Sequence, residues 1–486
     1  MINAVFHYFP TFLSNKGKEY GRETYKKILE LMKARGVNTK LVLGWGHTYF
    51  SDLKFLDSIV LEINGIDCRS FPSDSAKMKF ILENYLKSNI RIPDDLYNKL
   101  LTKLGCYIEQ LSKYEIWGLR YGDFLNTFNI FIRFFYQYLS TEKIDIVYFS
   151  HVVHLANDLI LYEIAKYLNI KTFFLNPFVE AETKKPLLIY TDTMDYDNFY
   201  HLMTKKLWNC ECTIPKTYKK DLPYMKNIHI PQVDDRHFGI GRKEALGSLI
   251  PFFRKKYTDS DYFITKIARR VMKVKVYKDS LKARDNYIQP VDFSQKYVYF
   301  GLHLQPEATT TFYGGKYSDQ LLAIENLASI LPDDWKIYVK ENPKQDDMFR
   351  GKSFYERLHL IDKAVLVPME TNTYDLIEHS QFVASITGTM IYEAVCGGKP
   401  ALMFGHIWYD RLPGVFKYTP DLKVDDIINY QIDHDELQQK VRNFYSTCLE
   451  GSLWEHYSFD DENERRIVEF MLSAIPIEKQ KEIKSN

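Results

Sequence analysis

The sequence predicts an α/β protein with two Rossmann-like halves, at roughly residues 1–200 and 295–475. Short apolar runs typical of buried strands alternate with helical runs twice along the chain, which indicates doubly wound parallel sheets. A polar, basic stretch separates the two alternations, and 486 residues is enough for two or three domains. Because ligands of such sheets bind at the carboxyl ends of the strands, we expect a site in a cleft between two facing halves.

The composition excludes several classes of protein. The 64 Lys and Arg residues balance 63 Asp and Glu residues to a formal net charge of +1, whereas a nucleic-acid-binding protein is usually basic. An aromatic share of 15% argues against extended disorder. The six cysteines form no Cys-x-x-Cys pair, which favours reduced thiols, and the first residues lack the features of a signal peptide. No apolar run reaches about 18 residues, so we expect a cytoplasmic protein without a membrane-spanning helix.

The first half begins with a β-α-β unit. The apolar run 2–9 predicts a buried strand, and apolar residues at helical spacing predict a helix over 19–35, which Gly36 ends. Residues 40–43 predict the second strand. A helical excursion rich in aromatic residues is expected to follow at about 75–140.

A strand over 144–149, a Gly-free helix over 151–168 and a strand over 171–175 are expected next. Residues 200–294 differ in being polar and basic with several prolines, and we interpret them as an insertion plus a linker. The alternative is a basic face that meets an anionic acceptor or a membrane surface.

The second half repeats the alternation from Lys296 onward, in the order expected of a parallel sheet. The expected strands are 297–302, 335–339, 365–367, 382–386 and 400–404, and the expected helices are 319–331, 373–379, 389–396, 437–448 and 460–474. The charged tail 476–486 is expected to be frayed.

The motif with the most chemical content is the string 385–405, which opens with Ser385 and in which a strand runs through Thr387-Gly388-Thr389 directly into a helix. Free amides and hydroxyls at a helix N-terminus bind anions, and Gly388 allows a close approach of the backbone to a phosphate. Glu393 lies one turn into the helix, where a carboxylate can bind ribose hydroxyls. The structural alternative is a plain N-cap at Thr389 and a surface acid at Glu393.

Other strand ends of the second half carry polar side chains that suit the same ligand. His303, Gln305 and Glu307 follow the first strand, where His303 can donate to a phosphate or a leaving oxygen and Gln305 can bind a base or sugar. Lys340 and Asn342 follow the next strand, where a lysine suits a phosphate counter-charge. The structural alternatives are a satisfied core histidine and a surface lysine.

Three strings lie within about residues 295–420: GLHLQPEATT, YVKENP and NTYDLIEHSQFVASITGTMIYEAVCGGKPALMFGHIWYD. They resemble the bacterial capsule and surface-polysaccharide glycosyltransferases of the Kdo-transferase type, and a weaker likeness extends over 149–175. This resemblance implies a GT-B fold, a nucleotide-activated sugar donor held mainly by the second half, and no metal. It also implies that the donor is CMP-Kdo or a related CMP-activated ulosonic acid.

By motif, the resemblance implies a donor site lined by Gln305, Glu307, Lys340, Ser385, Thr387, Gly388, Thr389 and Glu393. Such enzymes often carry a His-Pro pair where this chain has Asn342-Pro343. Asparagine can hydrogen-bond a phosphate or a base but cannot act as a general acid, which shifts that role to His303.

Carboxylates of the first half are the candidates for the acceptor chemistry. An inverting glycosyl transfer needs a base on the acceptor hydroxyl, whereas a retaining one can use a carboxylate nucleophile. Glu180 and Glu182 follow the strand expected to end at Leu175, and Asp192 follows the apolar run 187–190. All three acids and both stereochemical outcomes stay open at this point.

The sequence therefore predicts a metal-independent glycosyltransferase that moves a sugar to a surface polysaccharide or lipid-linked glycan. The nearest alternative is a transfer from a UDP- or GDP-hexose. A non-catalytic scaffold of a capsule assembly complex that binds sugar nucleotides or glycans is the second hypothesis, and a sugar-nucleotide epimerase is the third. We expect nucleotide-sugar and glycan or glycolipid partners and no nucleic acid, and we keep open a peripheral contact with the inner membrane or the polysaccharide assembly machinery.

Overall fold

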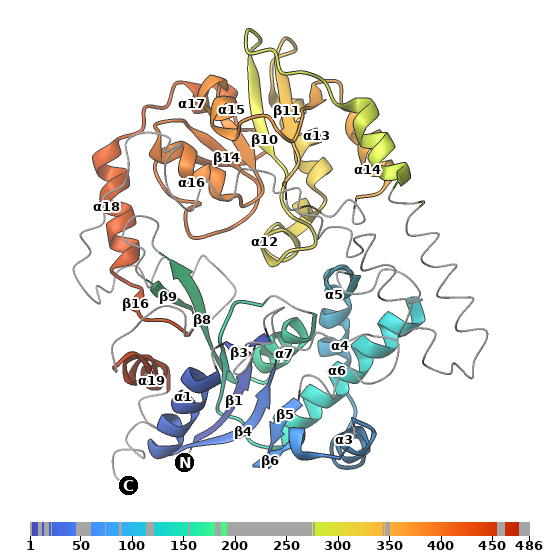
Figure 1. Cartoon of the computed structure of the whole chain (residues 1–486), viewed down its shortest axis with the longest axis vertical. Coiled ribbons are helices and arrows are strands. Elements are labelled where there is room, and N and C mark those ends of the chain that lie inside the picture. Colours follow the sequence, from blue (N-terminus) through green and yellow to red (C-terminus); the bar gives the residue numbers. More distant parts are fainter. Residues whose placement is uncertain are drawn as a thin grey trace, which may run out of the picture. The chain divides into compact units, whose positions relative to one another are not determined.

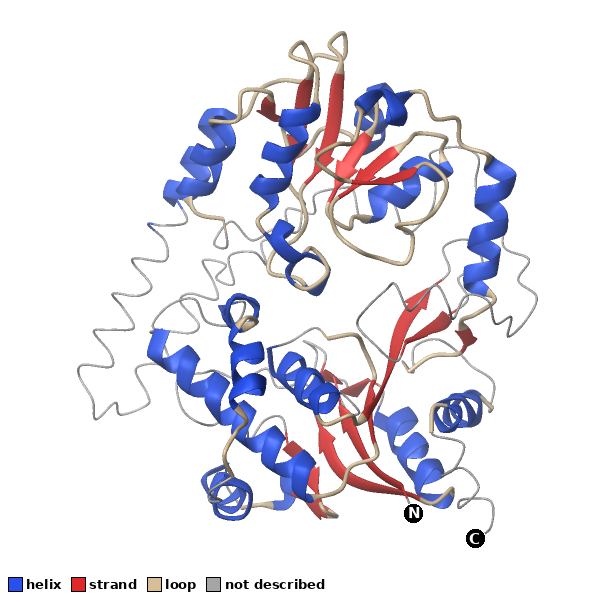
Figure 2. Cartoon of the chain, turned by 180° about the vertical axis from the view of Figure 1, so that it is seen from behind, coloured by secondary structure: helices blue, strands red, loops and turns tan. Residues whose placement is uncertain are grey.

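The computed structural model describes residues 2–7, 12–13, 19–20, 22–44, 60–72, 74–86, 90–112, 121–153, 156–179, 186–191, 275, 278–343, 345, 350–453 and 462–475. The chain forms two compact units. Unit 1 comprises Met1–Cys212 and Lys440–Asn486, and unit 2 comprises Thr213–Gln439. Each unit has its own sheet with helices on both faces (Figure 1, Figure 2). This confirms the predicted α/β class with two Rossmann-like halves, while the cleft between them stays a prediction.

Unit 1 contains an eight-stranded mixed sheet in the order β16-β9-β8-β7-β1-β4-β5-β6. The central strands β8, β7, β1 and β4 run parallel, and antiparallel strands extend the sheet at both sides. The strands are β1 (Ile2–His7), β4 (Val37–Leu43), β5 (Val60–Ile63), β6 (Ile66–Asp67), β7 (Ile146–Phe149), β8 (Lys171–Val179), β9 (Pro186–Thr191) and β16 (Leu449–Glu450), beside a separate hairpin of β2 (Phe12–Leu13) and β3 (Glu19–Tyr20).

Helix α1 (Arg22–Ala34) has the amphipathic pattern that the sequence predicts. Tyr25, Ile28 and Met32 recur at helical spacing, and all three are buried in one apolar cluster with residues of β1. Gly36 follows the helix with a φ of +79°, a left-handed conformation that favours glycine at a helix C-terminus.

The chain is helical where the sequence indicates an excursion, and its elements include η1 (Cys68–Ser70), α3 (Asp74–Ile81), η2 (Leu82–Leu86), α4 (Asp94–Leu101), α5 (Leu104–Ser112) and α6 (Tyr121–Thr141). Phe131, Phe135 and Tyr138 recur at helical spacing along α6 and are buried. Helix α7 (Ala156–Tyr167) connects the parallel strands β7 and β8, as the sequence predicts.

Strand β8 is longer than the sequence predicts. It runs to Val179 rather than ending at Leu175, because its second half pairs antiparallel with β9. The apolar run 187–190, which the sequence analysis did not assign to a strand, lies in β9 and forms part of the sheet.

The last described segment of the chain belongs to unit 1, whereas the sequence assigned residues up to 475 to the second half. Strand β16 pairs with β9 in the sheet of unit 1. Helix α19 (Asn463–Ser473) buries Ile467, Val468 and Met471 in the apolar cluster that contains β1, and the Tyr148 hydroxyl donates to the Met471 carbonyl at 3.0 Å. Helical spacing indicates which face of α19 is apolar but not which sheet it covers, so the structure corrects this boundary.

Unit 2 contains a six-stranded parallel sheet in the order β12-β11-β10-β13-β14-β15. Its strands are β10 (Tyr297–Gly301), β11 (Lys336–Lys340), β12 (Ala364–Leu366), β13 (Val383–Ser385), β14 (Ala401–Met403) and β15 (Val415–Lys417). Its helices include α12 (Ala308–Thr311), η4 (Gly315–Ser318), α13 (Gln320–Ile330), α14 (Lys352–His359), α15 (Thr373–His379), α16 (Thr389–Cys396) and α17 (Val424–Ile428), and α18 (His434–Tyr445) follows. The strand order reverses between β10 and β13, and such a switch point is where doubly wound sheets bind ligands.

Most of the predicted insertion 200–294 and the tail 476–486 lie outside the described residues. No helix in the described part of the chain is both long enough and apolar enough to cross a membrane.

Candidate functional site

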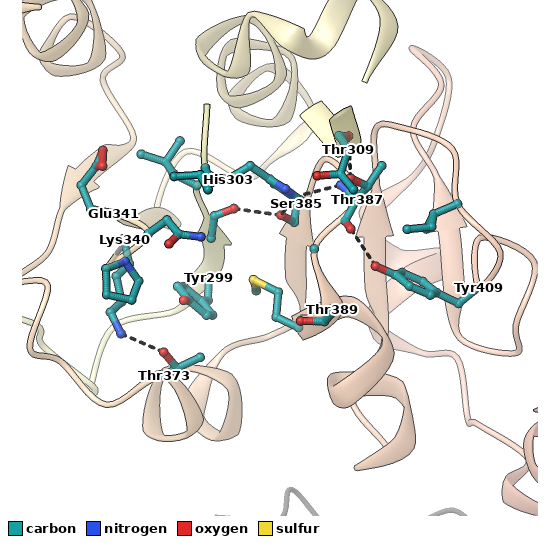
Figure 3. A pocket seen from close by; sticks show the side chains of 18 residues that line it. Tyr299, His303, Thr309, Lys340, Glu341, Thr373, Ser385, Thr387, Thr389 and Tyr409 are labelled. Atoms are coloured by element: carbon teal, nitrogen blue, oxygen red, sulfur yellow. Dashed lines mark hydrogen bonds between the residues drawn. The ribbon is translucent and has the colours of Figure 1, made fainter. Parts of the chain in front are cut away.

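A pocket of about 310 Å³ lies in unit 2 at the switch point of the sheet. Its wall comes from the carboxyl ends of β10, β11 and β13 and from the first residues of α15 and α16. Figure 3 shows Lys340 and Thr373 at one end of the pocket and Thr387 and Tyr409 at the other. The pocket therefore joins strand ends that the sequence analysis selected separately.

The turn that leads into α16, residues 387–390, offers unused hydrogen-bond donors. The Thr387 amide donates to His303 Nε2 at 3.0 Å. The amides of Gly388, Thr389 and Met390 donate to no acceptor in the described part of the chain, although all three residues line the pocket. Free amides at the positive end of a helix bind anions. We call residues 387–390 the α16 turn.

Glycines let the α16 turn pack closely against its neighbours. A Cβ atom at position 388 would lie 3.0 Å from Ser385 Oγ and 3.2 Å from His303 Nε2. A Cβ atom at Gly405 would lie 2.5 Å from Thr387 Cγ2. Both distances fall below ordinary van der Waals contact, so a side chain at either position would displace the turn.

Lys340, the last residue of β11, is a buried cation in the wall of the pocket. Lys340 is only 5% exposed, and its Nζ donates to Thr373 Oγ1 at 2.7 Å. No carboxylate among the described residues forms a direct ion pair with it. Burial lowers its pKa to about 8, and the nearby Glu370 carboxylate opposes this shift in part. A buried cation without a direct ion pair is unfavourable, so this position favours binding of an anion from solution.

Glu393 lies in the second turn of α16 with its carboxyl group buried. Burial raises its pKa to about 7, while the Thr389 hydroxyl opposes this shift by hydrogen bonding. Oε2 has no hydrogen-bond partner in the described part of the chain. Glu393 lies on the predicted helix but does not line the pocket, so its binding of a ligand hydroxyl stays a prediction.

His303 lines the pocket, and its Nε2 is bonded to the α16 turn. Besides accepting from Thr387, its Nε2 lies 2.9 Å from Ser385 Oγ, which also lies 2.8 Å from the Gly301 carbonyl oxygen. The pKa of His303 is lowered to about 4. Burial is the larger cause, and the positive charge of the nearby Arg350 guanidinium is the smaller one.

Two further predicted donor-site residues, Gln305 and Glu307, also do not line the pocket. The Gln305 side chain donates to the Ser318 carbonyl at 2.8 Å and accepts from Gln320 Nε2 at 2.9 Å. Its amide group is thus used within the protein, which removes the basis for expecting it to bind a base or sugar. Glu307 occupies the N-cap position of α12 and does not line the pocket, whereas Asn342 does.

The three acids expected to act on the acceptor, Glu180, Glu182 and Asp192, lie outside the described residues. Their role stays a prediction.

The sequence analysis missed several groups that shape the pocket. Arg350 forms a buried ion pair with Glu341 and donates to the His303 carbonyl, which ties the ends of β10 and β11 together. The Tyr409 hydroxyl donates to the Thr387 carbonyl at 2.7 Å. No local pattern links Arg350 or Tyr409 to these partners, because each reaches across the fold from a loop.

Comparisons with known proteins agree with the family that the three strings resemble. The family model described as capsule polysaccharide biosynthesis protein matches residues 252–428, which contain the whole pocket. No curated protein matches the chain in a sequence comparison.

Solved structures give only weak likenesses. The β-Kdo 2,7 transferase KpsC of Thermosulfurimonas dismutans is 13% identical, with 68% of this chain and 87% of that chain covered and a TM-score of 0.31. The UDP-GlcNAc 2-epimerase of Methanocaldococcus jannaschii is 10% identical, with 97% and 99% covered and a TM-score of 0.23. Superpositions of this quality carry no argument about function. The match of residues 252–428 to the family model agrees with the resemblance that the three strings carry.

Proposed function

We propose that the protein is a glycosyltransferase of capsule polysaccharide synthesis and that its unit 2 pocket binds a nucleotide-activated sugar. The observation that carries this proposal is that one pocket holds both Lys340, a buried cation without a direct ion pair in the described structure, and the amides of the α16 turn that have no acceptor there. The family match over the same residues supports it.

The two anion-binding features suit the leaving group of a glycosyl transfer. In the proposed reaction the bond between the anomeric carbon and the phosphate oxygen breaks, and its electron pair stays on the phosphate. An acceptor hydroxyl oxygen forms the new bond, and its proton passes to a base. Lys340 and the amides of Gly388 and Thr389 would stabilise the phosphate charge as it develops, without a divalent cation.

Carboxylates of unit 1 are the proposed groups for the acceptor. Glu180, Glu182 and Asp192 are the candidates for the base of an inverting reaction or the nucleophile of a retaining one. The acceptor we propose is a surface polysaccharide or a lipid-linked glycan.

For the donor we propose CMP-Kdo or a related CMP-activated ulosonic acid, on the resemblance of the three strings to Kdo transferases. A UDP- or GDP-hexose is the alternative. Glu393 is the proposed group for the ribose hydroxyls of either nucleotide. Its Oε2 has no partner in the described structure, but the residue lies beside the pocket and not in its lining.

Acceptor-dependent release of the nucleotide tests the proposal. The full-length protein is incubated with CMP-Kdo, UDP-hexoses or GDP-hexoses and a panel of synthetic and lipid-linked glycans, with EDTA present. CMP release that requires an acceptor is the expected result. Donor binding without turnover across the panel would support the scaffold instead, and a converted sugar nucleotide without acceptor would support an epimerase.

A further inference from the structure

We infer that His303 is a positioning residue, whose unprotonated Nε2 holds the α16 turn in the conformation that exposes its amides to an anion. This inference rests on the proposed function of the pocket. It gives His303 a different role from the proton donor that the sequence analysis expected.

The hydrogen bonds around Nε2 fix its protonation. A backbone amide can only donate, so the 3.0 Å contact from Thr387 N requires a lone pair on Nε2. Ser385 has one hydroxyl proton, which can point to the Gly301 carbonyl at 2.8 Å or to Nε2 at 2.9 Å. In either arrangement Nε2 remains an acceptor, and the single ring proton is on Nδ1.

Protonation of the imidazole would break this contact. An imidazolium carries hydrogens on both nitrogens, so an N–H on Nε2 would face the N–H of Thr387. The surroundings oppose that state. His303 is only 9% exposed. The Arg350 guanidinium, which donates to the His303 carbonyl and pairs with Glu341, adds positive charge nearby. Lys340 lines the same pocket.

The bond from His303 is one of several that immobilise the start of the turn. Thr387 Oγ1 donates to the Thr309 carbonyl at 2.8 Å, and the Thr387 carbonyl accepts from the Tyr409 hydroxyl at 2.7 Å. The next three amides have no acceptor among the residues that the structure describes. Figure 3 shows these contacts converging on Thr387 from separate elements. One amide of the turn is thus anchored by His303, and the others are held ready for an anion without rearrangement.

Two substitutions of His303 distinguish the role of Nε2 from that of Nδ1. In His303→Gln the side-chain amide reaches the position of Nε2 and can accept from Thr387, whereas in His303→Asn the amide reaches only the position of Nδ1. We expect His303→Gln to keep nucleotide affinity and kcat within about 3-fold of the wild type. We expect His303→Asn to lose roughly 10-fold or more in affinity, the usual consequence of a lost buried hydrogen bond. The control is His379→Gln, because His379 is exposed and bonds only its own helix in the described structure.

Other outcomes overturn the inference. If His303→Asn kept the nucleotide affinity and His303→Gln lost it, Nδ1 rather than Nε2 would be the nitrogen that supports binding. A loss of kcat of about 100-fold in both variants with unchanged affinity would identify a proton donor. Affinities near the wild type in both variants would show that the bond to Thr387 is dispensable.

A nitrogen-15 spectrum of the wild-type protein tests the same inference without a substitution. From pH 6 to pH 8, we expect the chemical shift of His303 Nε2 to be that of an unprotonated ring nitrogen. We also expect a scalar coupling across its hydrogen bond to the Thr387 amide. A protonated Nε2 would refute the inference, and this measurement also decides the case in which neither variant rescues affinity. If the wild type binds no nucleotide at all, the proposed function fails, yet the nitrogen signal still reports on His303.

Discussion

The first strand of each unit's parallel core has a buried histidine near its carboxyl end, and the two histidines differ in what they hold. His7 ends β1, and its Nε2 lies 3.4 Å from Asn157 Nδ2, a side chain of α7. His303 follows β10, and its Nε2 accepts from a backbone amide of the α16 turn. Burial lowers the pKa of both, to about 3 for His7 and about 4 for His303. Both histidines are thus neutral and buried near the carboxyl end of a strand. They differ in their hydrogen-bond partner, which for His303 alone is the turn that offers amides to an anion.

One lysine of each unit shows the same contrast more sharply. Lys40 in unit 1 pairs with Glu142 at 3.0 Å, and the two side chains are 23% and 21% exposed. Lys340 in unit 2 is more buried and donates to the Thr373 hydroxyl. It forms no direct ion pair in the described structure, although the Glu370 carboxylate nearby raises its pKa. A paired charge stabilises the fold, whereas an unpaired one destabilises the empty protein and favours an anionic ligand. This difference supports placing the donor site in unit 2.

Replacing Lys340 by methionine has the largest expected effect. Lys340→Met removes the one cation that we assign to the donor phosphate, so nucleotide affinity should fall about 10- to 100-fold. The same change removes an unpaired buried charge, so the nucleotide-free protein should become more stable by about 1–3 kcal/mol at pH 7. Calorimetric titration and thermal unfolding measure the two effects.

Lys336→Met is the matched control for Lys340→Met, because Lys336 begins the same strand at the opposite end of the sheet. It should leave nucleotide affinity unchanged. A Lys340→Met variant that is less stable than the wild type would contradict the claim that its charge is uncompensated.

Glu393→Gln should change how stability depends on pH. The carboxyl pKa is about 7 in the folded protein against an ordinary value of 4.5, so near neutral pH the folded state keeps a proton that the unfolded state releases. The stabilising contribution of this proton is present below about pH 4.5 and is lost as pH rises through 7. Between pH 5 and pH 8 the wild type should lose about 1–3 kcal/mol that Glu393→Gln does not lose. Parallel stability curves, measured by urea unfolding of both proteins, would contradict the assignment.

Local signals were enough to predict the elements that form the pocket. The helix 389–396 was predicted with the bounds it has, because a strand, a Thr-Gly-Thr turn and a Gly-Gly pair after the helix mark its ends. The polar residues at strand ends were found because parallel strands bring their carboxyl ends to one edge. Lys340, Thr387 and Thr389 consequently meet in one pocket as the sequence indicates.

Features set by distant partners escaped the sequence analysis. Gln305 follows a strand end as a binding residue would, yet Ser318 and Gln320 use its amide. The placement of α19 on the sheet of unit 1 depends on which apolar surface is left uncovered, and helical spacing carries no such information. The contact between His303 and the Thr387 amide could not be predicted for the same reason, since the two residues lie 84 positions apart.

Replacing Lys40, the paired lysine of unit 1, has the smallest expected effect. It should lower the stability of the protein, whereas Lys340→Met should raise it. Lys40→Met leaves Glu142 without its cation, so the protein should lose about 0.5–1 kcal/mol, as is usual for a partly exposed ion pair. Nucleotide affinity should not change. Adding Glu142→Gln removes the remaining charge and should restore most of the loss, which thermal unfolding of the single and double variants measures. If Lys40→Met stabilised the protein as Lys340→Met is expected to do, pairing would not distinguish structural from binding lysines in this fold, and the argument that places the donor in unit 2 would lose its electrostatic basis.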